Sequence, residues 1–112
     1  MDKMKDIKLI ALDLDGTTLA DSDTLSKRTQ TAIESAIKSG ITVVAASGRP
    51  FVMMPDSVMD IGGLDYAITS NGAVISKGGK TVHRSLILPD DVLKILGAVR
   101  NDDGILEGFI DG

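Results

Sequence analysis

The sequence has 112 residues, of which 43% are hydrophobic and 25% are charged, and its formal net charge is −4. These values are typical of one soluble globular domain and leave too little chain for two. The absence of cysteine excludes a disulfide framework and thiolate metal sites. Lysine and arginine are dispersed and the apolar runs are too short to cross a bilayer, so we expect no nucleic-acid partner and no membrane partner. The first residues lack the apolar core of a signal peptide, and we expect a cytoplasmic protein.

Residues 7–14 are apolar almost throughout, which predicts a strand buried inside a sheet. Asp13 and Asp15 lie at its carboxyl end, and residues two apart on a strand point to the same side. Gly16 lets the chain turn sharply away, and Thr17 brings a hydroxyl and a backbone N–H group close by. Because neighbouring carboxylates repel each other, a site that keeps both is typical of a bound cation. The segment therefore indicates a site for magnesium and phosphate.

A helix and a second strand follow in the sequence. Ser26 is a suitable N-cap for a helix that runs to about Ser39, and Gly40 is a suitable residue to end it. Residues 41–46 are again continuously apolar and lead directly to Ser47. A strand, a helix and a strand with short connections form a βαβ unit, so we expect the two strands to be parallel.

The remaining sequence predicts a third strand, a hairpin and a further helix. Pro55 must begin or kink any helix within residues 51–61. The expected elements are a strand at 66–70, hairpin strands at 73–76 and 80–85, a helix that opens at 88–91 and ends at 101–104, and a strand at 105–110.

Small polar residues follow each of the three expected parallel strands: Asp13 and Asp15, then Ser47 and Gly48, then Asn71. Since the carboxyl ends of parallel strands lie along one edge of a sheet, these groups can converge. In such a site one carboxylate attacks phosphorus to form an aspartyl phosphate, while the other protonates the leaving oxygen and then activates water. Mg²⁺, a hard cation that prefers oxygen ligands, would bridge carboxylate and phosphate. Ser47 and the Gly48 N–H would hold phosphate oxygens as donors.

Three segments resemble motifs of a known family. Asp13-Leu14-Asp15-Gly16-Thr17-Thr18-Leu19 resembles the first motif of haloacid dehalogenase-like phosphatases, and Ser47-Gly48-Arg49-Pro50 resembles their second. With Ser70-Asn71-Gly72-Ala73 added, the chain resembles the N-terminal portion of the Cof-like branch, which carries a type IIB cap. The resemblance implies an α/β fold with a three-layer, Rossmann-like parallel sheet. It implies a partial core at residues 1–86 and the beginning of an α/β cap at residues 87–112.

The resemblance also implies roles for individual residues. Asp13 would be the nucleophile and Asp15 the general acid and base, and both would ligate Mg²⁺, Asp15 through its backbone carbonyl. Ser47 would bind phosphate, and Gly16, Thr17 and Gly48 would form the rest of the phosphate site. Arg49 and Asn71 would face substrate or cap. Without the family, Ser47-Gly48 reads as an ordinary turn after a strand, and Asn71-Gly72 is as much a turn signal as a substrate contact.

By this resemblance the chain stops inside the cap, so the third and fourth family motifs lie beyond Gly112. The two carboxylates are then opposed only by Mg²⁺, and we expect weakened metal affinity and poor catalysis. The first strand would also present an unpaired apolar edge, through which we expect a fragment to form homo-oligomers or swap elements.

Three functional interpretations remain open. The first is a Mg²⁺-dependent phosphatase of small phosphorylated metabolites, seen here in part. The second is a non-catalytic, truncated module that acts in assembly or interaction. The third is a phospho-accepting regulatory domain, which shares an aspartate at a strand end.

Overall fold

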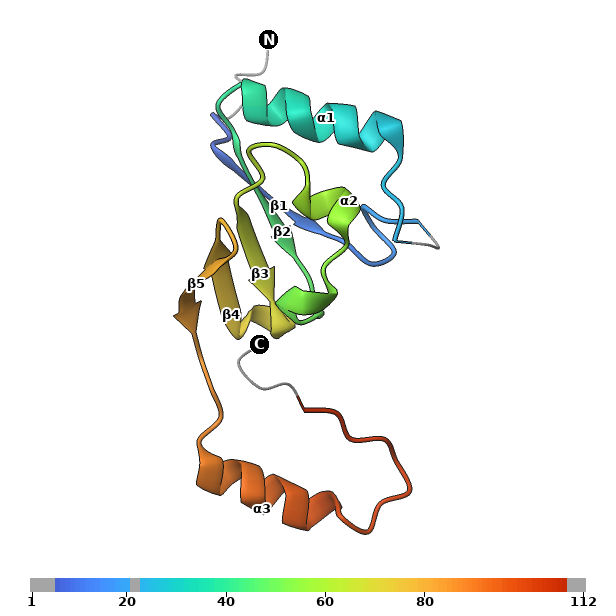
Figure 1. Cartoon of the computed structure of the whole chain (residues 1–112), viewed down its shortest axis with the longest axis vertical. Helices are drawn as coiled ribbons and strands as arrows, with labels where there is room; N and C mark the ends of the chain where they lie inside the picture. Colours follow the sequence, from blue (N-terminus) through green and yellow to red (C-terminus); the bar gives the residue numbers. More distant parts are fainter. Residues whose placement is uncertain (1–5, 21–22, 109–112) are drawn as a thin grey trace.

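The computed structural model describes residues 6–20 and 23–108, and within them one mixed sheet forms the centre of the molecule (Figure 1). Its strands run in the order β1-β2-β3-β4-β5. The first three strands are parallel, and the last two form an antiparallel hairpin. The strands are β1 (Leu9–Asp13), β2 (Thr42–Ala46), β3 (Tyr66–Thr69), β4 (Val74–Lys77) and β5 (Lys80–Arg84). The predicted α/β, Rossmann-like fold class is confirmed.

The helices also follow the predicted order. They are α1 (Lys27–Lys38), α2 (Asp56–Met59) and α3 (Pro89–Val99), with short 3-10 turns η1 (Phe51–Met53) and η2 (Ser70–Gly72). Ser26 caps α1 as predicted, because its Oγ accepts a hydrogen bond of 3.1 Å from the backbone N–H of Thr29. Pro55 stands directly before α2, at the start of the helix. No helix in the described part of the chain is long and apolar enough to cross a membrane.

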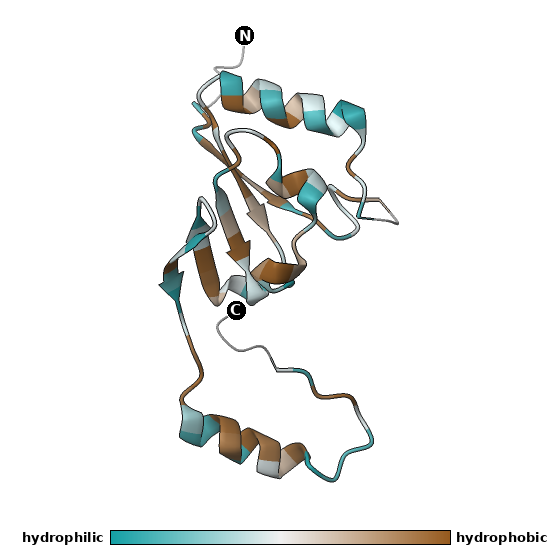
Figure 2. Ribbon diagram, in the orientation of Figure 1, coloured by the Kyte–Doolittle hydropathy of each residue, from teal (hydrophilic) through white to brown (hydrophobic). Residues whose placement is uncertain are grey.

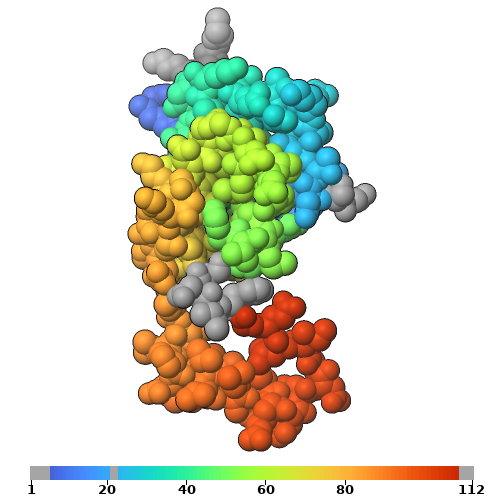
Figure 3. Space-filling model, in the orientation of Figure 1, coloured from blue at the N-terminus to red at the C-terminus, as the bar shows by residue number. Residues whose placement is uncertain are grey.

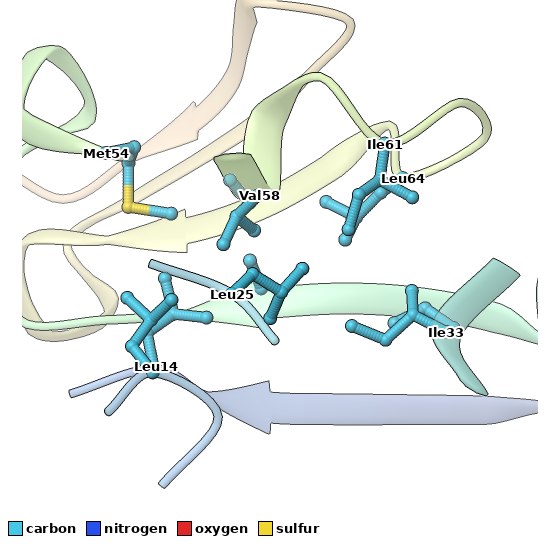
Figure 4. Packing of buried hydrophobic residues seen from close by; sticks show 11 residues of the cluster. Leu14, Leu25, Ile33, Met54, Val58, Ile61 and Leu64 are labelled. Carbon is cyan, nitrogen blue, oxygen red and sulfur yellow. The ribbon is translucent and has the colours of Figure 1, made fainter. Parts of the chain in front are cut away.

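The hydrophobic core lies between the sheet and the helices α1 and α2 (Figure 4). Ile33 from α1 and Val58 from α2 belong to the same buried cluster. The sheet residues of this cluster lie two apart along β2 or opposite each other in register, so they share one face of the sheet: Val43, Ala45 and Ala67. In the described residues, α1 and α2 therefore cover the same face.

Strand β1 lies at the edge of the sheet, with β2 as its neighbour in the described structure. The strand is predicted correctly, but the expectation that it is buried is wrong. The side chain of Leu9 is 57% exposed. Among residues 7–14 only Leu14, one residue beyond the strand, is fully buried, with 1% of its surface exposed. An apolar groove of about 210 Å³ runs between β1 and α1. Among the described residues β1 therefore has the unpaired edge that the sequence predicts, while self-association through it stays a prediction.

Helix α3 stands apart from the sheet, as Figures 1 and 3 show. Apolar residues, which colour much of its ribbon brown in Figure 2, are not covered: no residue of α3 is buried, and the side chain of Leu93 is 68% exposed. The strand expected at residues 105–110 is wrong for residues 105–108, which form neither helix nor strand, and residues 109–110 lie outside the described residues. The division into core and cap at residue 86 stays a prediction.

Candidate active site

The predicted site residues gather at the carboxyl ends of the three parallel strands. Asp13 is in register with Ala46 of β2, and Ala46 is in register with Ile68 of β3. The loops that leave these strands therefore start at the same level of the sheet, which is where open α/β sheets bind ligands.

The loop after β1 holds Asp13 by two threonine hydroxyls. Thr17 Oγ1 donates to Asp13 Oδ2 over 2.7 Å, and Thr18 Oγ1 donates to the Asp13 carbonyl over 2.6 Å. The loop closes because the Leu14 carbonyl accepts hydrogen bonds from three successive N–H groups, those of residues 17–19. Gly16 makes the turn with a φ of 74°, a conformation that favours glycine. Asp13 is exposed, and no described residue donates a hydrogen bond to its other carboxylate oxygen.

The Asp15 carboxylate is bound by Arg49 and Ser47 of the loop after β2. Arg49 Nε lies 3.1 and 3.2 Å from the two carboxylate oxygens, and Arg49 Nη2 lies 2.5 Å from Oδ1. Ser47 Oγ donates to Oδ2 over 3.3 Å. These hydrogen bonds, above all those from Arg49, hold the pKa of Asp15 below its ordinary value. The expectation that Mg²⁺ alone balances the negative charge of the two carboxylates is therefore wrong for Asp15, which pairs with Arg49.

Arg49 also binds two groups that the sequence analysis did not single out. Its Nη2 lies 2.6 Å from Asp23 Oδ1, and its Nη1 donates to the Met53 carbonyl over 3.3 Å. The hydrogen bond from Arg49 lowers the pKa of Asp23 as well, and the two carboxylates together raise the pKa of Arg49. All three guanidinium nitrogens thus donate to protein acceptors. Asp23 lies in a polar turn with no pattern of its own, so no local sequence signal could have found this pairing.

The loops after β2 and β3 interlock. Ser47, which is 7% exposed, donates its N–H to the Ile68 carbonyl over 2.9 Å, and its Oγ accepts the N–H of Arg49 over 3.1 Å. Ser70 donates its N–H to the Arg49 carbonyl over 2.8 Å. The side chain of Asn71 lies directly over Gly48, where a Cβ atom would come within 2.9 Å of Asn71 Oδ1. Gly48 therefore gives the Asn71 amide room to approach the backbone.

The loop after β3 has an uncommon backbone conformation. Ser70 and Asn71 have φ values of 50° and 55°, and Gly72 follows with 92°. Left-handed residues other than glycine are uncommon and are found most often at functional sites. Asn71-Gly72 is thus a tight turn, as its sequence predicts, and it also brings a side-chain amide to the same end of the sheet.

The structure joins the predicted residues in three groups: Asp13 with Thr17, Asp15 with Ser47 and Arg49, and Gly48 with Asn71. Gly16 connects the first two groups. In the described part of the chain, no three histidine, cysteine or acidic residues lie close enough together to hold a metal ion. The roles of these residues toward phosphate, substrate and metal stay predictions.

Comparison with known proteins identifies the family. The family model of haloacid dehalogenase-like hydrolases matches residues 10–110. The phosphatase YcsE of Bacillus subtilis (strain 168), which acts on 5-amino-6-(5-phospho-D-ribitylamino)uracil, is 31% identical over 96 residues, which are 86% of this chain and 39% of YcsE. A haloacid dehalogenase-like hydrolase from B. subtilis has a similar structure, with a TM-score of 0.75, 33% identity and coverage of 87% of this chain and 34% of that one.

A third similar protein indicates the branch. The sugar phosphatase BT4131, of subclass IIB of the same superfamily, matches with a TM-score of 0.72 and 26% identity, over 83% of this chain and 37% of that one. The chain thus spans between 34% and 39% of the length of these three proteins. It belongs to the haloacid dehalogenase-like hydrolases, a family with phosphatases among its members, and is similar to their Cof-like, subclass IIB branch.

Proposed function

We propose that this chain carries the nucleophile and the general acid and base of a Mg²⁺-dependent phosphatase that cleaves phosphate monoesters through an aspartyl phosphate. The observation that carries the proposal is the set of contacts at the carboxyl ends of β1 and β2. There Thr17 orients the Asp13 carboxylate, whose second oxygen has no hydrogen bond from any residue that the structure describes, while Ser47 and Arg49 hold Asp15.

In the first step, an Asp13 oxygen attacks phosphorus as the bond to the leaving oxygen breaks. Asp15 gives its proton to that oxygen, so the products are an alcohol and the aspartyl phosphate of Asp13. In the second step, Asp15 takes a proton from water as the water oxygen attacks phosphorus, which releases phosphate and restores the Asp13 carboxylate. The Arg49 ion pair favours ionised Asp15, which is the form that the second step needs, and it disfavours the protonated form that the first step needs.

The groups that hold the phosphoryl oxygens in this proposal belong to the loop after β2. Ser47 is nearly buried, and its hydroxyl is already placed by Asp15 and by the N–H of Arg49. Its single O–H is donated to Asp15 in this structure, so the hydroxyl would turn from Asp15 to a phosphoryl oxygen when substrate binds. The N–H groups of Gly48 and Gly16 are the further donors in this proposal, whereas the N–H of Thr17 already donates to the Leu14 carbonyl.

Oxygen ligands are what Mg²⁺ requires, and the site offers them without sulfur or imidazole. The Asp13 carboxylate and the Asp15 backbone carbonyl would hold the ion, which would neutralise charge between carboxylate and phosphate when bound. The described residues offer no further acidic ligand to the ion, since no three histidine, cysteine or acidic residues there lie in an arrangement that could hold a metal.

The relatives support small phosphorylated metabolites as the substrate class. YcsE acts on a phosphorylated ribitylamino-uracil, and BT4131 is a sugar phosphatase. In our proposal residues 1–86 form part of the catalytic core, and residues 87–112 begin a cap that contacts substrate. The exposed apolar side chains of α3, such as Leu93, would then pack against further cap structure.

The test is hydrolysis of a generic aryl phosphate by the full chain with and without Mg²⁺. We expect phosphate release that requires Mg²⁺ and is lost in Asp13→Asn, which keeps the size of the side chain but removes its nucleophilic charge. Asp102→Asn, an exposed carboxylate after α3, is the matched control and should retain full activity. No release by the unmodified chain would favour the non-catalytic module instead, and stable phosphorylation without release would favour the phospho-accepting regulator.

A further inference from the structure

Asp23 is a charged residue that contacts Arg49 of the proposed active site, and it lies outside the three segments that resemble family motifs. We propose that Asp23 is a positioning residue, which fixes the Arg49 guanidinium in the orientation that holds the Asp15 carboxylate. The inference rests on the proposed function, because that function makes Asp15 the general acid and base. Asp23 reaches Asp15 only through Arg49, so it is not itself a catalytic residue.

The contacts around Arg49 show how the orientation is fixed. Nη2 is shared between Asp15 Oδ1 at 2.5 Å and Asp23 Oδ1 at 2.6 Å, while Nη1 donates to the Met53 carbonyl. The guanidinium is thus bonded on three sides, and the side chain is 23% exposed. A planar guanidinium group that is fixed at two of its nitrogens can bind a carboxylate in only one orientation.

Asp23 is itself held in place by the α2 side of the molecule. The hydroxyl of Ser57, in the first turn of α2, donates to the Asp23 carbonyl over 2.8 Å. A continuous chain of hydrogen bonds therefore runs from Ser57 through Asp23 and Arg49 to Asp15. It links α2 to the loop after β1, and its last member, Asp15, is the proposed acid and base.

Removal of Asp23 would free one side of the guanidinium. Arg49 would keep its bonds to Asp15 and to Met53, but its plane could rotate, and the Asp15 carboxylate would rotate with it. Because small displacements of a catalytic group reduce the rate of the chemical step, we expect kcat to fall about 10-fold. KM should change little, since Asp23 has no contact with substrate in this account.

The experiment compares three variants of the full chain by NMR and by kinetics. Asp23→Ala removes the acceptor, Asp23→Asn keeps an oxygen acceptor without the charge, and Asp56→Ala removes an exposed carboxylate that lines the same surface depression as Asp23. The NMR signals are the Nε–H group of Arg49 and the carboxyl carbon of Asp15. The kinetic readout is aryl phosphate hydrolysis with Mg²⁺, with kcat and KM measured separately.

We expect Asp23→Ala to shift both NMR signals and to lower kcat, Asp23→Asn to restore most of both, and Asp56→Ala to match the unmodified chain. Arg49 and Asp15 signals that do not move in Asp23→Ala would overturn the inference. If Asp23→Ala fails to fold, Ser57→Ala tests the same chain of hydrogen bonds, and unchanged signals there would also overturn it. An unmodified chain without activity would contradict the proposed function alone, and the NMR comparison would still decide whether Asp23 positions Arg49.

Discussion

Gly16 makes the turn that carries the chain from Asp13 into the loop of Asp15 and Thr17, and its replacement by alanine isolates the cost of that turn. Its φ is 74°, and a Cβ atom built there would meet no atom within 4 Å. The effect of Gly16→Ala is therefore one of backbone conformation alone. A left-handed conformation costs a residue with a Cβ about 1–2 kcal/mol. The lower entropy of the unfolded alanine chain offsets roughly 0.4–1 kcal/mol of this.

We expect Gly16→Ala to reduce the free energy of unfolding by about 1 kcal/mol, which lowers Tm by roughly 4–8 °C in a domain of this size. Thermal and urea denaturation measure the change. Gly62→Ala is the matched control, because Gly62 has an ordinary φ and equally open surroundings. It should leave stability unchanged or raise it by about 0.5 kcal/mol. A Gly16→Ala variant as stable as Gly62→Ala would refute the turn geometry on which the site depends.

Three further predictions concern the ion pair, the first helix and the sheet edge. Because Arg49 holds the pKa of Asp15 below 3.8, the ion pair stabilises the fold above that pH, and this contribution is lost as the pH falls through the pKa of the folded state. Urea denaturation should therefore show that the difference in stability between the unmodified chain and Arg49→Met shrinks below about pH 4. A difference that stays constant with pH would contradict this. Ser26→Ala removes the cap of α1 and should cost about 1 kcal/mol in urea denaturation, whereas Thr31→Ala, an exposed residue inside the helix, should not. Light scattering should show concentration-dependent association through β1 that Leu9→Lys abolishes and Ile105→Lys does not; a monomer at high concentration would count against the edge pairing.

The order and type of nearly all elements could be predicted because local signals agree with the fold. Ser26 and Gly40 bound α1, and glycines 78 and 79, with φ values of 56° and 77°, make the predicted hairpin turn. The burial of β1 could not be predicted, because an apolar run shows that a strand suits a buried position and does not show how many neighbours cover it. The strand expected at residues 105–110 failed for residues 105–108, since an apolar pattern forms a strand only where a partner strand is present.

The site could be predicted as a location but not as a network. Parallel strand topology brings the loops after β1, β2 and β3 to one edge, so the grouping of Asp15 with Ser47 follows from the sequence. The pairing of Arg49 with Asp23 does not, because these residues lie 26 positions apart and neither position has a periodic or spacing signal. Long-range ion pairs depend on the direction of loops, which short sequence patterns do not determine.

The proposed mechanism requires that Asp13 becomes covalently phosphorylated. The most direct measurement is mass spectrometry of the full chain, quenched in acid during reaction with a small phosphodonor and Mg²⁺ and then digested. We expect one phosphoryl group on the peptide that contains Asp13, absent in Asp13→Asn and present in Asp102→Asn. Phosphorylation of another residue, or release of phosphate without any phosphorylated Asp13, would contradict the account.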